Sequence, residues 1–185
     1  IIAAPSTTKE VVDFIKKIRE SLGIYTFGKT AKNEKFNYKW ISGGFAIQTT
    51  DLEYKNNWKI MTKKKPTKNQ LKQMELAWKF IKRIKSNTII VMDKNLPMTR
   101  GIGAGQTSRV KSTTIALLQA GKMASGAVLA SDSFFPFTDS IKLAHKYKIG
   151  AIIQQGGSLG DKKAIEEANK LGIPMVFTDK RAFWH

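Results

Sequence analysis

Cysteine is absent from the 185 residues of this chain. Without a thiol, the chain has no disulfide, no zinc–thiolate site and no cysteine nucleophile, and we expect a cytoplasmic protein. No apolar run approaches the roughly 18 residues that a membrane-spanning helix needs, and no secretory signal pattern opens the sequence. The first residues are Ile1 and Ile2, which already resemble a strand, so we expect that other residues precede them.

Acidic residues are scarce: the chain has 14 Asp and Glu against 32 Lys and Arg, for a formal net charge of +18. Such a charge is typical of a nucleic-acid-binding surface, of an enzyme with phosphate- or carboxylate-bearing substrates, or of a lysine-rich surface without a specific partner. The lysines are spread along the sequence, and only Lys63, Lys64 and Lys65 form a run. The aromatic residues do not alternate with them, which argues against the nucleic-acid alternative.

Two common catalytic motifs are also missing. The chain has no His-x-Glu followed by Pro-Cys-x-x-Cys, which excludes zinc deaminase chemistry. It has no Gly-x-x-x-x-Gly-Lys-Ser/Thr, which excludes a P-loop. The hydrophobic content of 42% is that of an ordinary globular protein.

Pro66 looks like a boundary between two parts of the chain. Before it, the pattern predicts a strand over 1–4, a helix over 7–22 that ends at Gly23, a strand bent or bulged around Gly43 and Gly44, and a short strand over 58–61. After it, helices are expected over 67–83, 107–120, 139–148 and 161–171, and strands over 88–92, 99–104, 127–130, 151–153 and 173–177. This alternation predicts an α/β fold, with a partly parallel sheet covered by helices.

Several expected helices carry recognisable end signals. Thr67 and Gln70 have the spacing of a capping box, and Asp139 is expected to cap the helix that it opens. The helix over 107–120 is expected to bury a face that includes Val110, Leu117 and Leu118.

The first segment with chemical potential runs from Gly101 to Arg109 and reads Gly-Ile-Gly-Ala-Gly-Gln-Thr-Ser-Arg. Its glycines would allow the backbone to approach a ligand closely, and the start of a helix offers free N–H groups. Arg109 adds a bidentate donor. The segment is not a dinucleotide fingerprint, because Gln106 stands where that motif requires glycine. A tight strand-to-helix turn explains it equally well.

The second segment, 131–139, places three phenylalanines and a proline between a strand and a helix. Buried phenylalanines usually belong to the core, but loops normally lie on the surface. An aromatic loop there favours a flat heteroaromatic ligand such as an imidazole or a pterin, which it would hold by stacking.

A third segment, 154–158 (Gln-Gln-Gly-Gly-Ser), also follows a strand and precedes a helix. Ligands of α/β sheets gather at the carboxyl ends of strands, so the three loops are expected to line one crevice. The fourth segment is the C-terminus, 179–185, whose closing Phe-Trp-His indicates a docked end rather than a frayed one. Arg181 is expected to contact a phosphate there.

These segments resemble the AICAR transformylase part of the bifunctional AICAR transformylase/IMP cyclohydrolase family. The matching stretches are 85–87, 101–110, 130–139, 154–158 and 177–185. The resemblance covers the whole chain and corresponds to about the last third of the family's proteins. It implies zinc-free, cytidine-deaminase-like units with a three-layer α/β/α arrangement: residues 1–65 would be the tail of a first unit and residues 66–185 a complete second unit.

The resemblance also implies roles for single residues. Asn87, in a catalytic position, and Arg109 match residues that hold AICAR around its amine and carboxamide. Phe134 matches the aromatic residue beside the imidazole, and Arg181 matches an arginine at the phosphate. The matches to the family's folate pocket, which binds 10-formyltetrahydrofolate, are Ser133, Pro136, Asp139 and Ser158. The matches to its structural monovalent cation site, for which potassium is the candidate ion, are Ser86, Asp132 and His185.

The implied activity is that of a formyltransferase of purine (IMP) biosynthesis, which moves the formyl group of 10-formyltetrahydrofolate to the AICAR amine. That amine is conjugated with its ring and is a poor nucleophile, so the reaction needs positioning, a base and donors to the developing oxyanion. The family uses a Lys-His pair for the proton, and neither His145 nor His185 follows a lysine. We therefore expect part of a site, completed in a homodimer or by a partner chain, and no cyclohydrolase activity. The alternative is a non-catalytic module that binds AICAR or folate.

Overall fold

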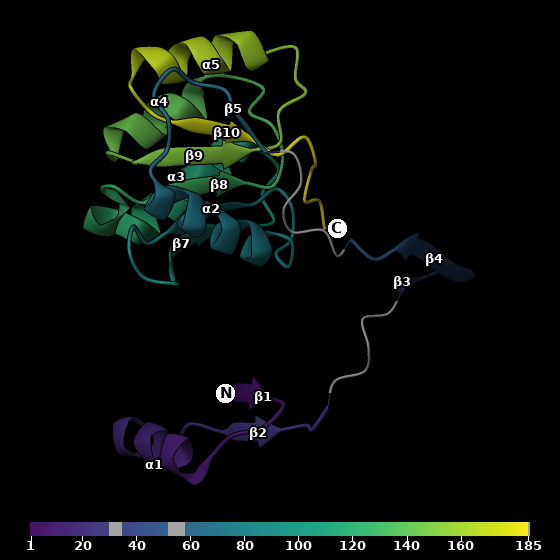
Figure 1. Ribbon diagram of the computed structural model, residues 1–185. Helices are drawn as coiled ribbons and strands as arrows, with labels where there is room; N and C mark the ends of the chain where they lie inside the picture. Colours follow the sequence, from purple (N-terminus) through teal and green to yellow (C-terminus); the bar gives the residue numbers. More distant parts are fainter. Residues whose placement is uncertain (30–34, 52–57, 185) are drawn as a thin grey trace. The chain divides into compact units, whose positions relative to one another are not determined.

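The computed structural model describes residues 1–29, 35–51 and 58–184 (Figure 1). The chain divides into two compact units, Ile1–Leu52 and Glu53–His185. They are called the N-terminal unit and the C-terminal unit below, and each is described by itself. Within the described residues, no helix combines the length and the apolar character that crossing a membrane requires.

The N-terminal unit begins with a β–α–β motif. Strands β1 (Ile2–Ala4) and β2 (Ile24–Thr26) pair in parallel, and helix α1 (Lys9–Ile18) connects them. The hydroxyl of Thr8 accepts a hydrogen bond from the Val11 amide and caps α1. None of the residues of α1 is buried, so the apolar stripe of this helix is exposed in the part of the chain that the structure describes.

The predicted bent strand around Gly43 is instead a hairpin. Strands β3 (Phe36–Ile41) and β4 (Gly44–Thr49) pair in antiparallel fashion, with Ile41 opposite Gly44. The two residues between them form a tight turn in which Gly43 has a φ of 84°. Short hairpin turns favour glycine at such a position because a side chain would be strained there.

The C-terminal unit is built around a mixed sheet with the strand order β5-β10-β9-β8-β6-β7. The strands are β5 (Lys59–Ile60), β6 (Ile89–Met92), β7 (Thr99–Gly103), β8 (Val128–Ser131), β9 (Ala151–Gln154) and β10 (Met175–Phe177). The helices are α2 (Lys68–Ile81), α3 (Arg109–Ala120), α4 (Asp139–Lys146) and α5 (Asp161–Lys170), with a short 3-10 helix, η1 (Gly121–Ala124). Strands β8, β9 and β10 are parallel, whereas β5, β6 and β7 pair in antiparallel fashion. The predicted α/β fold with a partly parallel sheet is confirmed.

Helices pack against both faces of this sheet, because successive strand residues point to opposite sides. One buried cluster joins α3, α4 and α5 to strand residues that include Ile89 and Val91. The other cluster joins α2 to the strand residues that alternate with these, among them Ile90 and Met92. Figure 1 shows β8, β9 and β10 side by side between these helices. The shared sheet holds the loops that follow its strands in fixed positions.

The division between the two units lies earlier than the boundary predicted at Pro66. The predicted short strand over 58–61 is β5, and it pairs with β10, with Ile60 opposite Val176. The sequence pattern predicts that this segment is a strand, but it does not predict which edge of which sheet the strand joins. The capping box at Thr67 and Gln70 is present as predicted.

Two other expectations about helices are wrong in detail. The buried residues of α3 are Ser112, Thr113, Ala116, Leu117 and Ala120. Leu117 is thus buried as predicted, whereas Val110 and Leu118 are 42% and 64% exposed. Asp139 does not cap α4, because it is the first residue inside the helix. The cap residue is Thr138, whose side chain makes no cap hydrogen bond. Its carboxylate there lies near the positive end of the helix dipole.

The turn between β6 and β7 depends on Asp93. Its carboxylate accepts hydrogen bonds from the amides of Asn95 (2.8 Å) and Leu96 (2.9 Å) and from Nε of Arg100 (2.5 Å). The two amides are the main reason why the pKa of Asp93 is lowered from 3.8 to about 2, with a smaller contribution from Arg100. Asp93 therefore favours folding wherever it is ionised.

We expect Asp93→Asn to lower the free energy of unfolding at pH 7 by roughly 1–2 kcal/mol, because the charge-assisted bonds are lost. A lowered native pKa stabilises the fold above the unfolded-state value near 3.8, and this contribution is lost as the pH falls toward 2. Urea unfolding of both proteins should therefore show a difference at pH 7 that shrinks by pH 2.5. An equal difference at both pH values would contradict this role.

Candidate functional site

The four segments singled out in the sequence meet at one end of the sheet. The loops 131–139 and 154–158 follow the carboxyl ends of β8 and β9, and the C-terminal tail follows β10 (Figure 1). The antiparallel strand β6 brings residues 85–88 to the same end, because Ile89 pairs with Ser131. This is the end of an open α/β sheet at which ligands normally bind.

Arg109 is the centre of a buried polar cluster at this end. Its Nη2 donates to Oδ1 of Asn87 at 2.9 Å and to Oδ1 of Asp132 at 2.8 Å. The arginine side chain is 10% exposed and the aspartate side chain is fully buried. Nε of Arg109 is buried without a hydrogen-bond partner in the described residues. The cluster brings together two predicted AICAR residues around a guanidinium whose hydrogen-bonding capacity is only partly used within the described residues.

The remaining contacts of Asn87 fix its side chain. Nδ2 donates to the carbonyl of Gln106 at 3.0 Å, and the Asn87 carbonyl accepts from the hydroxyl of Ser112 at 2.9 Å. The amide of Asn87 is thus held between the glycine-rich turn and Arg109. Such an arrangement presents an oriented amide to a ligand without requiring it to reorganise on binding.

Two glycines of the 101–109 segment serve packing rather than a ligand. A Cβ at Gly101 would lie 1.9 Å from the Ala116 carbonyl oxygen, and one at Gly103 would lie 1.9 Å from the Ser112 carbonyl oxygen. Strand β7 therefore contacts the backbone of α3 directly. The expectation that these glycines admit a ligand is wrong for both positions, and of the three glycines only Gly105 has open space at that point.

The three phenylalanines of the 131–139 loop have different environments. Phe135 is 1% exposed and belongs to the core, Phe137 is 72% exposed, and Phe134 is intermediate. Two glutamines at the end of β9 hold the loop: Oε1 of Gln154 accepts from the Phe135 amide at 2.7 Å, and Oε1 of Gln155 accepts from the Ser133 hydroxyl at 2.8 Å. Phe134 therefore lies between two anchored residues, and its side chain is partly exposed.

The residues matched to the folate pocket come from two adjoining loops. Ser133 is buried, whereas Pro136 and Asp139 are exposed. The hydroxyl of Ser158 accepts from the Gly160 amide at 3.0 Å, and a Cβ at Gly160 would lie 2.8 Å from the carbonyl oxygen of Pro136. The structure therefore brings these loops together, with Ser133 less accessible than the other predicted residues.

The C-terminal tail is docked, as the sequence predicts. The Ala182 amide donates to the Asp132 carbonyl at 2.7 Å. Ser86 and Trp184 exchange two hydrogen bonds: the Ser86 amide donates to the Trp184 carbonyl at 2.9 Å, and the Trp184 amide donates to the Ser86 hydroxyl at 3.1 Å. Arg181 is exposed beside this anchored segment, with its guanidinium 5.3 Å from the ring centre of Phe183.

The residues matched to a cation site are engaged with protein groups. The carboxylate of Asp132 accepts from Arg109 and from the Thr88 amide, and the Ser86 hydroxyl accepts from the Trp184 amide. His185 lies outside the described residues. Each of these described oxygens therefore already accepts at least one hydrogen bond from the protein, and the cation site stays a prediction. The described residues contain no cluster of three or more His, Cys, Asp or Glu suited to a metal.

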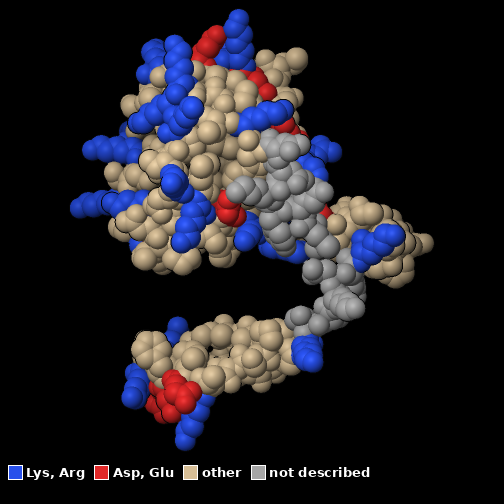
Figure 2. Space-filling view, in the orientation of Figure 1, with Lys and Arg blue, Asp and Glu red and all other residues tan. Residues whose placement is uncertain are grey.

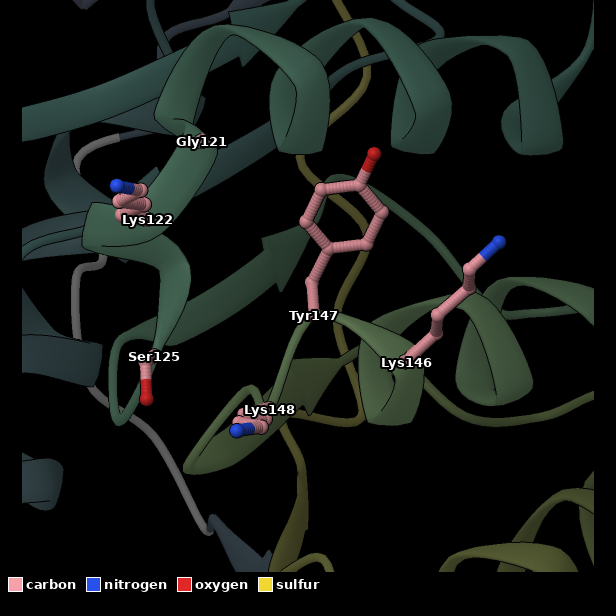
Figure 3. Close-up of a pocket in the computed structure, with 6 residues that line it drawn as sticks. All are labelled: Gly121, Lys122, Ser125, Lys146, Tyr147 and Lys148. Carbon is pink, nitrogen blue, oxygen red and sulfur yellow. The ribbon is translucent and has the colours of Figure 1, made fainter.

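A separate pocket of about 330 Å³ lies at the opposite end of the sheet (Figure 3). Its lining includes Ser125, which precedes β8, and Lys148, which precedes β9. Figure 3 shows the Lys146 side chain extending away from Lys122 and Lys148, so the lysines do not converge. The helices α3 and α4 also direct their negative C-terminal ends here, which disfavours an anion.

The positive charges show no single concentration on the face in view. In Figure 2 the Lys and Arg side chains project at separate places over the C-terminal unit. This distribution on the visible face does not resemble the continuous basic stripe of a nucleic-acid-binding surface.

Sequence reasoning missed the partnership of Asp132 with Arg109. Asp132 directly follows β8, whose residues are all apolar or small and are buried. A carboxylate that is buried next to such a strand must be paired or hydrogen-bonded. That signal identifies a buried ion pair, although it does not name the partner. Thr88 and Gln106 were also missed, because they contribute main-chain groups that any residue would supply.

The fold and the position of the polar cluster are those of α/β proteins that bind ligands at the carboxyl ends of parallel strands. The family is narrower: a profile of the AICARFT/IMPCHase bienzyme family matches residues 1–119, and the chain belongs to that family.

Curated relatives agree with this assignment. The bifunctional purine biosynthesis protein PurH of Trichodesmium erythraeum is 45% identical over 186 residues, which cover all of this chain and 35% of the relative. PurH of Listeria monocytogenes is 44% identical over 188 residues, and PurH of Nostoc punctiforme is 42% identical over 186 residues; both matches cover all of this chain and 36% of the relative. The chain thus spans about a third of the length of the curated relatives it matches.

Among solved structures, RibD of Acinetobacter baumannii has a TM-score of 0.40 and 15% sequence identity. The match covers 59% of this chain and 34% of the RibD chain. A similarity of this extent is too low to assign the fold.

Proposed function

We propose that this chain supplies the AICAR- and folate-binding part of a formyltransferase site, at which the formyl group of 10-formyltetrahydrofolate passes to the AICAR amine in purine (IMP) biosynthesis. The observation that carries the proposal is the buried Arg109 cluster, with Asn87 and Asp132 as its partners. Family membership supports the same reading, since the relatives are bifunctional purine biosynthesis proteins.

The chemistry explains why these groups suit AICAR. Asn87 and Arg109 offer an amide and a guanidinium with defined orientations, which match the adjacent amine and carboxamide of the imidazole. Phe134 offers a ring face for the imidazole itself. Arg181 projects from the docked tail and supplies a charge-assisted donor to the phosphate. Binding of this kind holds the poorly nucleophilic amine in place against the formyl carbon.

The proton of the amine must be taken by a base. The described histidine, His145, is exposed on the last turn of α4 and follows Ala144 rather than a lysine. We therefore propose that the acid–base group comes from residues outside this chain, in a homodimer or in a partner that carries the upstream half. Asn87 would then act by orienting the amine.

We also infer that the C-terminal unit is a zinc-free, cytidine-deaminase-like three-layer unit and that the N-terminal unit is the tail of another. The helices on both faces of the mixed sheet support the first statement. The exposed apolar stripe of α1 supports the second, because an amphipathic helix normally packs its apolar face against further structure.

A direct test combines binding with turnover. AICAR and 10-formyltetrahydrofolate should each bind the full natural chain that contains these residues, as measured by isothermal titration calorimetry, and together they should yield formyl-AICAR. Absence of AICAR binding would contradict the proposal. Binding without turnover would instead support the alternative, a non-catalytic AICAR- or folate-binding module that needs a partner chain for chemistry.

Arg181→Ala is expected to raise the dissociation constant for AICAR about 10- to 100-fold, because one charge-assisted contact to the phosphate is lost. Folate affinity should change much less, since Arg181 lies on the tail rather than on the Pro136 or Ser158 loops. Calorimetry with each ligand separates the two effects. Lys146→Ala removes an equal charge at the opposite end of the sheet and is the matched control. Equal losses for both ligands would rule out a phosphate contact.

Phe134→Ala is expected to weaken AICAR binding by about 1–3 kcal/mol through lost stacking. Phe134→Leu keeps an apolar side chain of similar bulk, so a comparable loss in that variant identifies the ring itself as the requirement. Thermal unfolding of both variants checks that the loop remains folded. Unchanged AICAR affinity in Phe134→Ala would show that the imidazole does not lie on this ring.

A further inference from the structure

The side chain of Asp132 is fully buried at the end of β8 and has two partners. Oδ1 accepts from Nη2 of Arg109 at 2.8 Å, and Oδ2 accepts from the Thr88 amide at 3.0 Å. Each carboxylate oxygen is therefore used by a different neighbouring segment. One oxygen fixes the carboxylate to the start of β6, and the other fixes the guanidinium to the carboxylate.

Stability alone gives no reason for a charged pair at this place. The desolvation cost of burying two ions is about as large as their attraction, and well-packed apolar residues would stabilise the fold equally well. What the pair adds is orientation: Asp132 and Asn87 each accept one hydrogen bond from Nη2, and together they fix that corner of the planar guanidinium. Its buried Nε has no partner in the described residues. The N–H groups of Nη1, which take no part in these two bonds, are thereby held in a fixed direction for a ligand.

The main chain of Asp132 has a second and separate task. Its amide donates to the Thr88 carbonyl at 3.2 Å, and its carbonyl accepts from the Ala182 amide at 2.7 Å. The second bond anchors the tail beside Arg181. A side-chain substitution at Asp132 leaves both main-chain bonds available, so it separates the support of Arg109 from the support of Arg181.

We propose that Asp132 is a positioning residue for AICAR binding: its carboxylate orients the Arg109 guanidinium, and it acts on the ligand through Arg109 and not through Arg181. This inference rests on the proposed function. It assigns to Asp132 a role in substrate recognition although its side chain is fully buried and acts only through Arg109.

The test is a pair of double-mutant cycles on the AICAR dissociation constant of the full natural chain, measured by calorimetry. Asp132→Asn keeps the size of the side chain and removes its charge, and we expect it to weaken AICAR binding about 10- to 100-fold. In an Arg109→Ala background, Asp132→Asn should cause no further loss. In an Arg181→Ala background, the two losses should multiply, because those residues act independently.

A merely structural role predicts a different pattern. If Asp132 only supported the fold, its substitution would lower AICAR affinity by the same factor in both backgrounds, and folate affinity would fall with it. Either result overturns the proposal. Should Asp132→Asn fail to fold, Asp132→Ser, which is also uncharged and is smaller, is tested in the same two cycles. Thermal unfolding of every variant confirms that folded proteins are compared.

The two proposals fail in distinguishable ways. If Arg109→Ala and Arg181→Ala both leave AICAR affinity unchanged, the proposed function is wrong and Asp132 has nothing to position. If Arg109→Ala weakens binding while Asp132→Asn does not, AICAR still binds at Arg109, and only the positioning role is overturned.

Discussion

Gly103→Ala is expected to lower the free energy of unfolding of the C-terminal unit by about 3 kcal/mol or more. The added Cβ would lie 1.9 Å from the carbonyl oxygen of Ser112 and 2.7 Å from its carbonyl carbon. These are backbone atoms of α3, so no side-chain rotation relieves the overlap. Helix α3 must move away from β7 or the strand must bend, and either change opens the buried interface between them.

The same substitution is expected to disturb contacts in the candidate site and so to weaken AICAR binding. Ser112 donates its hydroxyl to the Asn87 carbonyl at 2.9 Å, and Arg109 begins the same helix. A displaced α3 would carry both contacts with it, so AICAR affinity should fall together with stability. This coupling distinguishes Gly103 from a residue that contacts the ligand directly.

Denaturant unfolding followed by circular dichroism measures the stability change. Gly121→Ala is the matched control: it adds the same methyl group within the same unit, at a point with no atom within 4 Å. Its φ of 51° and ψ of −130° are strained for alanine, so a loss of about 1–3 kcal/mol is expected. If Gly103→Ala cost no more than this control, the close contact between β7 and α3 would not exist in solution.

The elements of the C-terminal unit are predictable from sequence because local rules agree there. The capping box at Thr67 and Gln70 is present in the structure, and short apolar runs form β6, β8 and β9. The order of the strands is not predictable in the same way. Alternation of helices and strands indicates a sheet, but it does not say that β6 lies between β8 and β7 and runs opposite to both.

Helix α3 shows where hydrophobicity misleads. A search for the most apolar face selects Leu117, which is buried, but also Val110 and Leu118, which are exposed. It misses the small residues Ser112, Thr113 and Ala116, which are buried. Small residues are required there because the glycine-containing strand β7 brings the two backbones into contact. The requirement arises from a neighbour, so the sequence of the helix alone does not reveal it.

The candidate site is predictable in its location and only partly in its contacts. Parallel strands bring their following loops to one end of a sheet, which is why the Phe134 loop and the Gln155 loop adjoin. The pairing of Arg109 with Asp132 joins a helix start to a strand end, and its geometry depends on how α3 packs. Motifs therefore identify which residues matter, whereas packing decides which of them touch.

Phe135→Ala is expected to destabilise the C-terminal unit by about 3–5 kcal/mol, the usual cost of removing a buried aromatic ring. Phe135 is 1% exposed and packs in the cluster that joins α3, α4 and α5 to the sheet. Its amide is also bound to Oε1 of Gln154 at 2.7 Å, so this residue anchors the loop by both its ring and its main chain. The substitution leaves a cavity that the surrounding helices fill only in part.

Phe137→Ala, two residues away in the same loop, is the matched control. The Phe137 ring is 72% exposed, and we expect its loss to change stability by less than about 0.5 kcal/mol. Denaturant unfolding compares the two variants, and equal effects would contradict the assignment of Phe135 to the core. Calorimetry with AICAR measures ligand affinity separately from stability, because Phe134→Ala should change the affinity at a nearly constant free energy of unfolding. Three neighbouring phenylalanines with the same side chain then give three different outcomes, because burial sets the contribution of Phe135, access to the ligand sets that of Phe134, and Phe137 has neither.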